Sequence, residues 1–216
     1  MAGKTKRPMG RLRERLHAAT AEAMLASAER TIIRHGYDRA TMQEIAADAG
    51  CATGTFYLYF KNKKVLFEAI VDRHAKAMFA VGRAEMETSP DPLEKIRLGI
   101  LGVLRYVREH RAFFRLFLRA MPMRFHAIEE EVGPTARLEH EDYSRLELDC
   151  LRRARRQGRV RSDVPLDMMM EFMDAVALSL VEQFVFTPHD LPVEEQVQIL
   201  WGLITGGIGA RSRHAK

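Results

Sequence analysis

Apolar residues recur every three or four positions along almost the whole chain, and this spacing restricts the possible folds more than any other feature. No long stretch alternates between apolar and polar residues. A spacing of three to four places apolar side chains on one face of an α-helix, whereas a half-buried strand needs a period of two. The sequence therefore predicts an all-α protein of about nine to ten helices.

Glycine, proline and capping residues mark where these helices begin and end. Glycine ends helices at low steric cost, and proline is tolerated in a first turn. Gly36, Gly50 and Gly158 are the clearest stops, and Pro134 is the clearest start. We expect helices at 11–35, 41–50, 52–58, 62–87, 92–110, 111–120, 124–132, 134–157, 166–186 and 193–211.

The composition fits a folded globular chain without a membrane anchor. The chain has 216 residues, of which 47% are hydrophobic, enough to form a sizeable core. The longest weakly polar run, 199–210, is shorter than the ~20 residues that span a bilayer, and no apolar segment follows the basic start. These features predict a cytoplasmic protein.

Neither cysteine indicates a disulfide framework or a zinc site. Cys51 and Cys150 are isolated, with no CxxC or Cys/His cluster around them. Cys51 is interpreted either as a buried inert thiol or as an oxidant sensor. We expect no metal and no cofactor.

Excess positive charge is concentrated near the N-terminus. Residues 1–64 carry a net charge of +6, the remainder carries −1, and the whole chain carries +5. A basic end on a nearly neutral body indicates one surface that binds a polyanion such as nucleic acid. Residues 1–10 are expected to form a flexible basic tail.

The segment 41–63 has the pattern of a helix-turn-helix, two short helices joined by a tight turn at Gly50. Thr41 and Glu44 have the spacing of a capping box at the start of the first helix. The second helix of such a motif enters the major groove of DNA. In that helix we expect Phe56 and Phe60, with Leu58 as a weaker candidate, to face the core.

The remaining side chains of the second helix suit contacts with DNA. Hydroxyl groups donate readily to phosphates, glycine lets the backbone approach closely, and a lysine at a helix N-terminus adds charge to an anion site. On these grounds the candidates are Thr53, Gly54, Thr55, Tyr57, Tyr59 and Lys63. Short helices also use aromatic residues as core, which is the alternative for the tyrosines.

The stretch from Ala28 to about Ile70 resembles the DNA-binding domain of the tetracycline-repressor (TetR) family of bacterial transcription regulators. The matching positions are Gly36-Tyr37, Ala40-Thr41, Glu44-Ile45-Ala46, Ala49-Gly50, Gly54-Thr55-Phe56-Tyr57, Tyr59-Phe60, Lys63 and Leu66. The resemblance implies a DNA-binding domain at 11–62 and an effector-binding and dimerisation domain at 63–212. It adds Thr41 and Gln43 to the contacts, places Gln43, Thr53 and Thr55 nearer to base edges, and assigns phosphates to Tyr59 and Lys63.

The chain departs from the family pattern at two contact positions. Ala52 replaces a frequent serine, which removes a helix cap worth about 1 kcal/mol. Thr53 replaces a frequent lysine, which removes one charged contact. Arg11, Arg13 and Arg15 are either an additional DNA-binding arm or part of a solvated tail.

The resemblance also implies a homodimer that binds a palindromic double-stranded operator, through the last two helices of each subunit. Interface candidates are Ala175, Val176, Ser179, Leu180, Trp201, Ile204, Gly207 and Ile208. The alternative is that these residues pack inside one subunit.

A small-molecule effector pocket is implied in the middle helices, for a hydrophobic ligand. Candidate lining residues are Met78, Phe79, Phe113, Phe114, Phe117, Met121, Phe125, Met169, Phe172 and Met173. Methionine-rich walls adapt to apolar ligands, although such residues also form ordinary cores. The function predicted is a repressor that its ligand releases from DNA, with activation left open.

Two other functions stay open at this point. One is an all-α enzyme, for which the eight scattered histidines provide no HExxH spacing and no paired nucleophile. The other is a ligand-responsive helical protein without specific DNA binding, which the departures at Ala52 and Thr53 favour.

Overall fold

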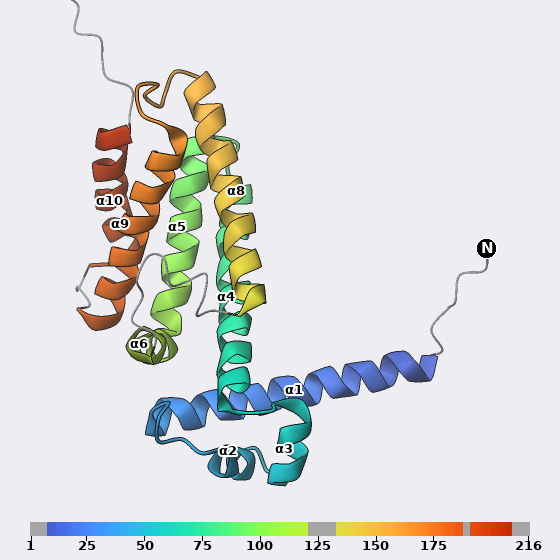
Figure 1. Cartoon of the computed structure of the whole chain (residues 1–216). Helices are drawn as coiled ribbons and strands as arrows, with labels where there is room; N and C mark the ends of the chain where they lie inside the picture. The colour runs from blue at the N-terminus through green and yellow to red at the C-terminus, as the bar shows by residue number, and fades with distance from the viewer. Residues whose placement is uncertain (1–7, 121–132, 188–190, 209–216) are drawn as a thin grey trace, which may run out of the picture. The chain divides into compact units, whose positions relative to one another are not determined.

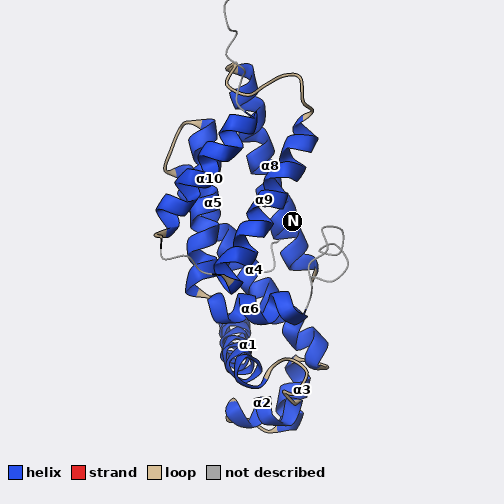
Figure 2. Cartoon of the chain, turned by 90° about the vertical axis from the view of Figure 1, so that its left-hand side faces the viewer, coloured by secondary structure: helices blue, strands red, loops and turns tan. Residues whose placement is uncertain are grey.

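The computed structural model describes residues 8–120, 133–187 and 191–208. Every regular element in these residues is an α-helix, which confirms the predicted all-α class (Figures 1 and 2). The helices are α1 (Pro8–His35), α2 (Met42–Asp48), α3 (Thr53–Tyr59), α4 (Lys63–Glu87), α5 (Pro92–Glu109), α6 (Arg111–Ala120), α8 (Pro134–Arg156), α9 (Leu166–Phe186) and α10 (Val193–Ile208). None of these helices is long and apolar enough to cross a membrane.

The helix ends follow the capping and glycine signals closely. α6 and α9 have the predicted bounds, and each other helix differs from its prediction by one to three residues at one or both ends. α1 starts at Pro8, so residues 8–10 of the expected tail are helical. Proline fits there because a first-turn N–H has no intrahelical acceptor to lose. The helix expected at 124–132 and the end of the one at 193–211 lie outside the described residues.

The chain divides into two compact units, Met1–Ile70 and Val71–Lys216. We call them the N-terminal unit and the C-terminal unit. α4 is one continuous helix whose first turns belong to the N-terminal unit and whose remainder belongs to the C-terminal unit. The proposed functional division after residue 62 falls just before this helix.

In the N-terminal unit, α2 packs against both α1 and α3. The core between them includes the fully buried side chains of Ile32, Ile45 and Phe56. Asp48 at the end of α2 accepts a 2.6 Å hydrogen bond from the Thr31 hydroxyl of α1, and this bond lowers the pKa of Asp48. The apolar core and this polar link together fix α2 on α1.

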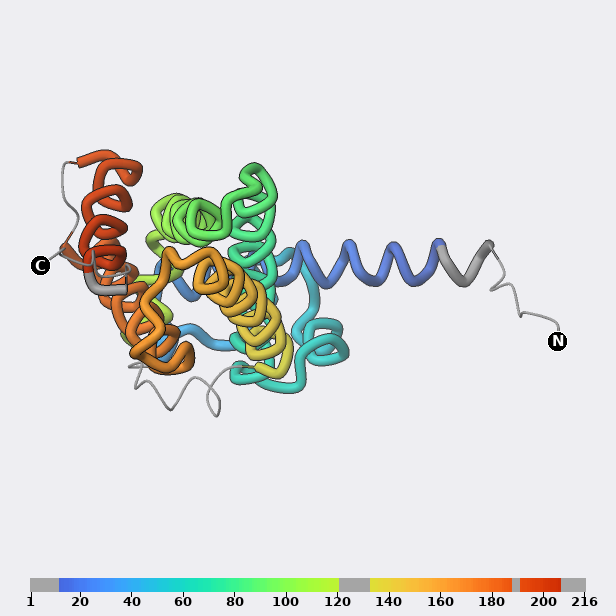
Figure 3. The backbone as a smooth tube through the Cα atoms, turned by 90° about the horizontal axis from the view of Figure 1, so that it is seen from above, coloured from blue at the N-terminus to red at the C-terminus, as the bar shows by residue number. Residues whose placement is uncertain are grey.

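In the C-terminal unit, α5 packs against α6, α8, α9 and α10. Figure 3 views these helices from above, with α10 at one edge as in Figure 1. The ring of Tyr143 from α8 lies against Gly82 of α4 and Gly99 of α5. A Cβ at Gly82 would lie 2.8 Å from the Tyr143 ring, and one at Gly99 would overlap its hydroxyl. Close approach of this ring explains both glycines.

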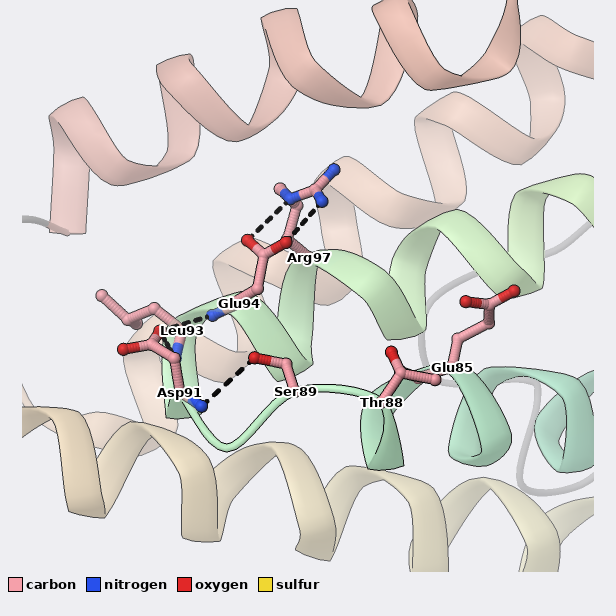
Figure 4. Close-up of polar contacts among 7 residues, drawn as sticks. All are labelled: Glu85, Thr88, Ser89, Asp91, Leu93, Glu94 and Arg97. Atoms are coloured by element: carbon pink, nitrogen blue, oxygen red, sulfur yellow. Dashed lines mark hydrogen bonds and ion pairs between the residues drawn. The ribbon is translucent and has the colours of Figure 1, made fainter.

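The connection between α4 and α5 is held by local polar contacts (Figure 4). Asp91 caps α5 by accepting hydrogen bonds from the N–H groups of Leu93 and Glu94, at 3.1 and 2.9 Å. The Ser89 hydroxyl accepts a 3.2 Å bond from the N–H of Asp91. Arg159 also donates to the Asp91 carboxylate, and this contact lowers the pKa of Asp91 most. The break that the sequence predicted at 89–92 is therefore an ordered helix junction.

We expect Gly99→Ala to destabilise the protein by about 1–3 kcal/mol, because the added methyl group overlaps the buried Tyr143 side chain. The free energy of unfolding from urea denaturation measures this change. Gly54→Ala is the control, since nothing lies within 4 Å of a Cβ there. Equal stability of Gly99→Ala and the wild type would contradict the packing argument.

Candidate nucleic-acid interface and ligand cavity

The start of α2 is fixed by the capping box that the sequence predicted. The hydroxyl of Thr41 accepts a 3.2 Å bond from the N–H of Glu44, and the Glu44 carboxylate accepts a 2.9 Å bond from the N–H of Thr41. The second bond is the largest cause of the lowered pKa of Glu44. Thr41 and Gln43 are both exposed, so both DNA-contact candidates on this side are accessible.

The turn before α3 depends on Gly50, which adopts a φ of 67°. Its N–H donates to the Ala47 carbonyl, and the N–H of Cys51 donates to the Ala46 carbonyl, each at 3.0 Å. This closed turn directs the chain into α3. Ala52 provides no side-chain cap, as its replacement of serine predicted.

One face of α3 is buried and the other is open. Phe56 and Phe60 lie in the core, at 0% and 6% exposure. Leu58 is 82% exposed, so the expectation that it faces the core was wrong. Two residues along a helix turn the side chain by about 200°, which puts Leu58 opposite Phe56 and Phe60.

The open face of α3 carries most of the predicted DNA contacts. Gly54, Thr55 and Tyr57 are exposed, and Thr53 is half-buried. Gly54 has a helical φ, and no atom of the described residues lies within 4 Å of the place of its missing Cβ. The packing of the chain therefore gives no reason for a glycine at this position. A partner that closely approaches this face, as DNA would, does give one.

The Tyr59 ring is held from the side by α1. It stacks on His17 with ring centroids 4.4 Å apart and an angle of 24° between the planes. The tyrosine is half-buried as a result. His17 therefore positions Tyr59, a role for which the sequence provides no local signal.

Lys63 is the most constrained of the predicted contacts. Its ammonium group donates to the backbone carbonyls of Tyr37, Asp38 and Ala40, at 2.8, 3.0 and 3.2 Å. It also lies 4.8 Å from the centroid of the Tyr37 ring. All three N–H bonds thus have acceptors within the chain, and a phosphate contact by Lys63 would have to replace one of them.

Other exposed basic residues are candidates for phosphate contacts in addition to Lys63. Lys61 lies two residues after the end of α3, is exposed, and makes no ion pair with any described residue. Arg13 and Arg15 are exposed on α1, while the side chain of Arg11 lies outside the description. Sequence reasoning overlooked Lys61, although the run of lysines at 61, 63 and 64 was the signal.

A cavity of about 330 Å³ lies within the C-terminal unit, among α4, α5, α6, α8 and α9. Six predicted effector residues line it: Met78, Phe79, Phe113, Phe114, Phe117 and Met173. Met169 is buried in the core instead, and Phe172 is 49% exposed. Met121 and Phe125 lie outside the described residues.

The cavity wall also carries polar groups that the sequence reasoning missed. Glu147 and Tyr143 of α8, Asp174 of α9 and His74 of α4 all line it. The Tyr143 hydroxyl is buried without a hydrogen-bond partner among the described residues. Buried α8 positions at 136, 143, 147, 150 and 154 have helical spacing, and this spacing was the signal for Glu147.

The predicted interface residues divide between the surface and the interior. Ser179 is exposed and Ala175 is half-buried. Leu180 and Ile204 are buried, and Val176 and Trp201 pack against the core, as the alternative of packing within one subunit predicted. Gly207 and Ile208 are helical, but their side chains lie outside the description. The exposed apolar residues of α9 and α10 are Met168, Phe172, Phe186, Ile199 and Leu203.

The N-terminal unit matches a known family. Residues 24–70 match the sequence profile of bacterial regulatory proteins of the tetR family. These residues form a DNA-binding domain of the tetR type. The chain is a DNA-binding transcription regulator and not an enzyme.

Individual transcription regulators resemble it over different shares of its length. The transcriptional repressor Rv1474c of Mycobacterium tuberculosis is 28% identical over 171 residues, 74% of this chain and 79% of that protein. The repressor BepR of Brucella suis is 31% identical over 91 residues, 40% of this chain and 42% of that protein. The crystal structure of a TetR family regulator from Marinobacter aquaeolei has a TM-score of 0.68 at 17% identity, covering 92% of this chain and 100% of that one.

We expect Gly54→Ala to separate stability from DNA binding. Alanine at this open helical position stabilises the fold by up to about 1 kcal/mol, yet its methyl group obstructs close approach of the DNA backbone. Thermal unfolding measures the first effect. Fluorescence anisotropy, with a DNA site selected from a random double-stranded library, measures the second. Unchanged DNA affinity would show that the open space at Gly54 is not a contact point.

Proposed function

We propose that this regulator is a homodimeric repressor that binds a palindromic operator and is released by a small ligand with an apolar body. The observation that carries the DNA-binding part is the open face of α3. There half-buried Thr53 and exposed Thr55 flank Gly54, and no packing contact among the described residues requires a glycine at that position.

In this proposal α3 lies in the major groove. Thr53, Thr55 and Gln43 reach base edges, and Leu58 adds an apolar contact suited to a thymine methyl group. Thr41, Tyr57, Tyr59 and Lys61 contact phosphates, which fix the register of the protein on the duplex. Gly54 permits the close approach of the two backbones.

The exposed apolar residues of α9 and α10 support a homodimer. Large apolar side chains that gather on two helices commonly mark an interaction surface. Ile199 and Leu203 are 57% and 70% exposed and lie one turn apart on α10. Exposed Gly202 and Gly206 on the same helix leave room for a partner helix to approach. Two subunits paired here would present two α3 helices to a palindrome.

The cavity supports release by a ligand. A ligand shifts a regulator away from DNA only when it binds the released conformation better than the DNA-bound one. α4 carries cavity residues such as Met78 and also supplies residues to the N-terminal unit. Ligand occupancy is therefore transmitted along α4 in this proposal.

Selection from a random double-stranded DNA library tests the DNA-binding part. We expect the wild type to enrich a palindromic site, and Tyr57→Phe to bind that site about tenfold more weakly, because one phosphate hydrogen bond is lost. Ile33→Ala is the control, since Ile33 is also partly exposed but lies on α1. Weak binding without sequence preference, equal in both proteins, would favour a ligand-responsive protein without a specific operator.

The homodimer is tested by Leu203→Glu, which places a charge in the proposed interface. We expect light scattering to report a monomer and the affinity for the palindrome to fall more than tenfold, since both half-sites no longer bind together. Leu138→Glu is the matched control, because Leu138 is 54% exposed on α8. A dimer in Leu203→Glu and a monomer in Leu138→Glu would move the interface to α8.

A further inference from the structure

Three carboxyl groups line the cavity of the C-terminal unit, although most of its wall is apolar. Glu141 of α8 pairs with Arg137 and Arg145, which leaves Glu147 and Asp174. Glu147 comes from α8 and Asp174 from α9. The apolar part includes Phe79, Phe113 and Phe117. This combination differs from an ordinary core, which excludes carboxylates unless they are paired.

Glu147 is buried and has no polar partner in the part of the chain that the structure describes. Only 6% of the residue is exposed, and it makes no hydrogen bond or ion pair with any described residue. An ionised carboxylate in such a place is costly, so an empty site favours the protonated acid. Burial, with a smaller effect from the nearby Asp174, raises the pKa of Glu147 to about 8.

Asp174 strengthens the preference of the site for positive charge. Burial also raises the pKa of Asp174, Glu171 adds to this rise, and His140 acts in the opposite direction. Two neighbouring carboxylates repel each other unless a cation or a proton lies with them. A positive group bound between α8 and α9 would satisfy both.

The other charged and titratable groups at the cavity have their own contacts. Arg137 lies 3.8 Å from Glu141, which also pairs with Arg145 at 3.4 Å. The Nδ1 of His74 lies 2.9 Å from the Tyr106 hydroxyl, and its ring stacks on Phe113 at 3.7 Å. The cavity-lining residues from α5 and α6 are apolar. His140 also lines the cavity, with its ring 5.8 Å from that of Phe79, and it acts on Asp174 through its charge. Neither Arg137 nor His74 forms an ion pair with Glu147 or Asp174.

The aromatic rings add a second feature that favours a cation. Phe113 stacks on Phe117 at 6.0 Å, and Phe79 lies 5.1 Å from Tyr143, so aromatic surfaces line the same space as the acids. Ring faces attract cations, most strongly where water is excluded. A volume of about 330 Å³ suits a compact apolar body with one charged group.

We propose that this cavity is a site for a lipophilic cation, whose positive group pairs with Glu147 and Asp174 and whose apolar part contacts Phe79, Phe113 and Phe117. The inference rests on the proposed function in taking this ligand as the effector. On binding, the Glu147 proton passes to solvent and the ligand's positive charge replaces it. The net charge of the site is therefore the same before and after the ligand binds.

Calorimetric titration of the full-length protein at pH 8 with three decyl probes tests the charge preference. Decyltrimethylammonium should bind at least tenfold more tightly than 1-decanol or decanoate. Glu147→Gln should lower the affinity for decyltrimethylammonium at least tenfold, and Asp174→Asn should lower it less. Asp149→Asn is the control, since Asp149 lies on the same helix but is exposed and paired with Arg152 at 2.9 Å.

Several outcomes overturn the cation site. They are no binding of decyltrimethylammonium, equal or tighter binding of 1-decanol or decanoate, and unchanged affinity in Glu147→Gln. Tight binding of 1-decanol would indicate a neutral ligand that accepts a hydrogen bond from protonated Glu147. Because glutamine keeps the shape of the side chain and carries no charge, we expect the variant to fold, and circular dichroism checks this.

The pH dependence provides a separate test, because the trimethylammonium group does not titrate. Below pH 8 the cation must displace the Glu147 proton, so affinity should rise between pH 6 and pH 8, by at most about tenfold per unit, and then level off. The binding heat should also depend on the ionisation enthalpy of the buffer. Glu147→Gln should lose both effects, and a wild type without either would contradict proton displacement.

Adding the selected DNA site distinguishes failure of this site from failure of the proposed function. If decyltrimethylammonium binds through Glu147 but leaves DNA affinity unchanged, the cation site stands and ligand-controlled release is wrong. If 1-decanol or decanoate releases the DNA while decyltrimethylammonium does not bind, release stands and the cation site is wrong.

Discussion

The arrangement of the helix-turn-helix depends on the ammonium group of Lys63, which binds three backbone carbonyls in the connection between α1 and α2. Buried or half-buried carbonyls outside a helix need such donors, because an unsatisfied carbonyl costs about as much as a lost hydrogen bond. A positive charge in the first turn of α4 interacts unfavourably with the helix dipole, and the hydrogen bonds to the three carbonyls must offset that cost. The open face of α3 is therefore supported by a residue outside α3, and replacing Lys63 would affect DNA binding even without a phosphate contact.

Much of this unit could be predicted from the sequence because its determinants are local. The capping box at Thr41 and the positive φ of Gly50 act within a few residues, and the pattern showed both. Leu58 was misplaced because an apolar side chain in a short helix was taken for core, although its spacing from Phe56 puts it outside. The partners of Lys63 lie more than twenty residues away and are backbone atoms, which have no sequence signature.

The C-terminal unit was harder to predict, because methionine and phenylalanine look the same in a core and in a cavity wall. Phe113 and Met173 line the cavity, whereas Met169 packs in the core and Phe172 faces outward. Only the tertiary arrangement separates these cases. Glu147 was missed for another reason. Most charged residues of α8 are solvated, so Glu147 was taken for one of them, although its helical spacing from Tyr143 and Cys150 puts it on the buried face.

The buried position of Glu147 links the stability of the C-terminal unit to occupancy of its cavity. Burying a polar group without a hydrogen-bond partner is unfavourable, so a carboxyl retained here has a cost for folding. A bound cation removes that cost, and a ligand that binds only the folded unit stabilises it by mass action. The same coupling meets the requirement for a switch, provided that the carboxyls approach the cation better in the released conformation than in the DNA-bound one. On this argument the feature that weakens the empty unit is the one that makes it responsive to a ligand.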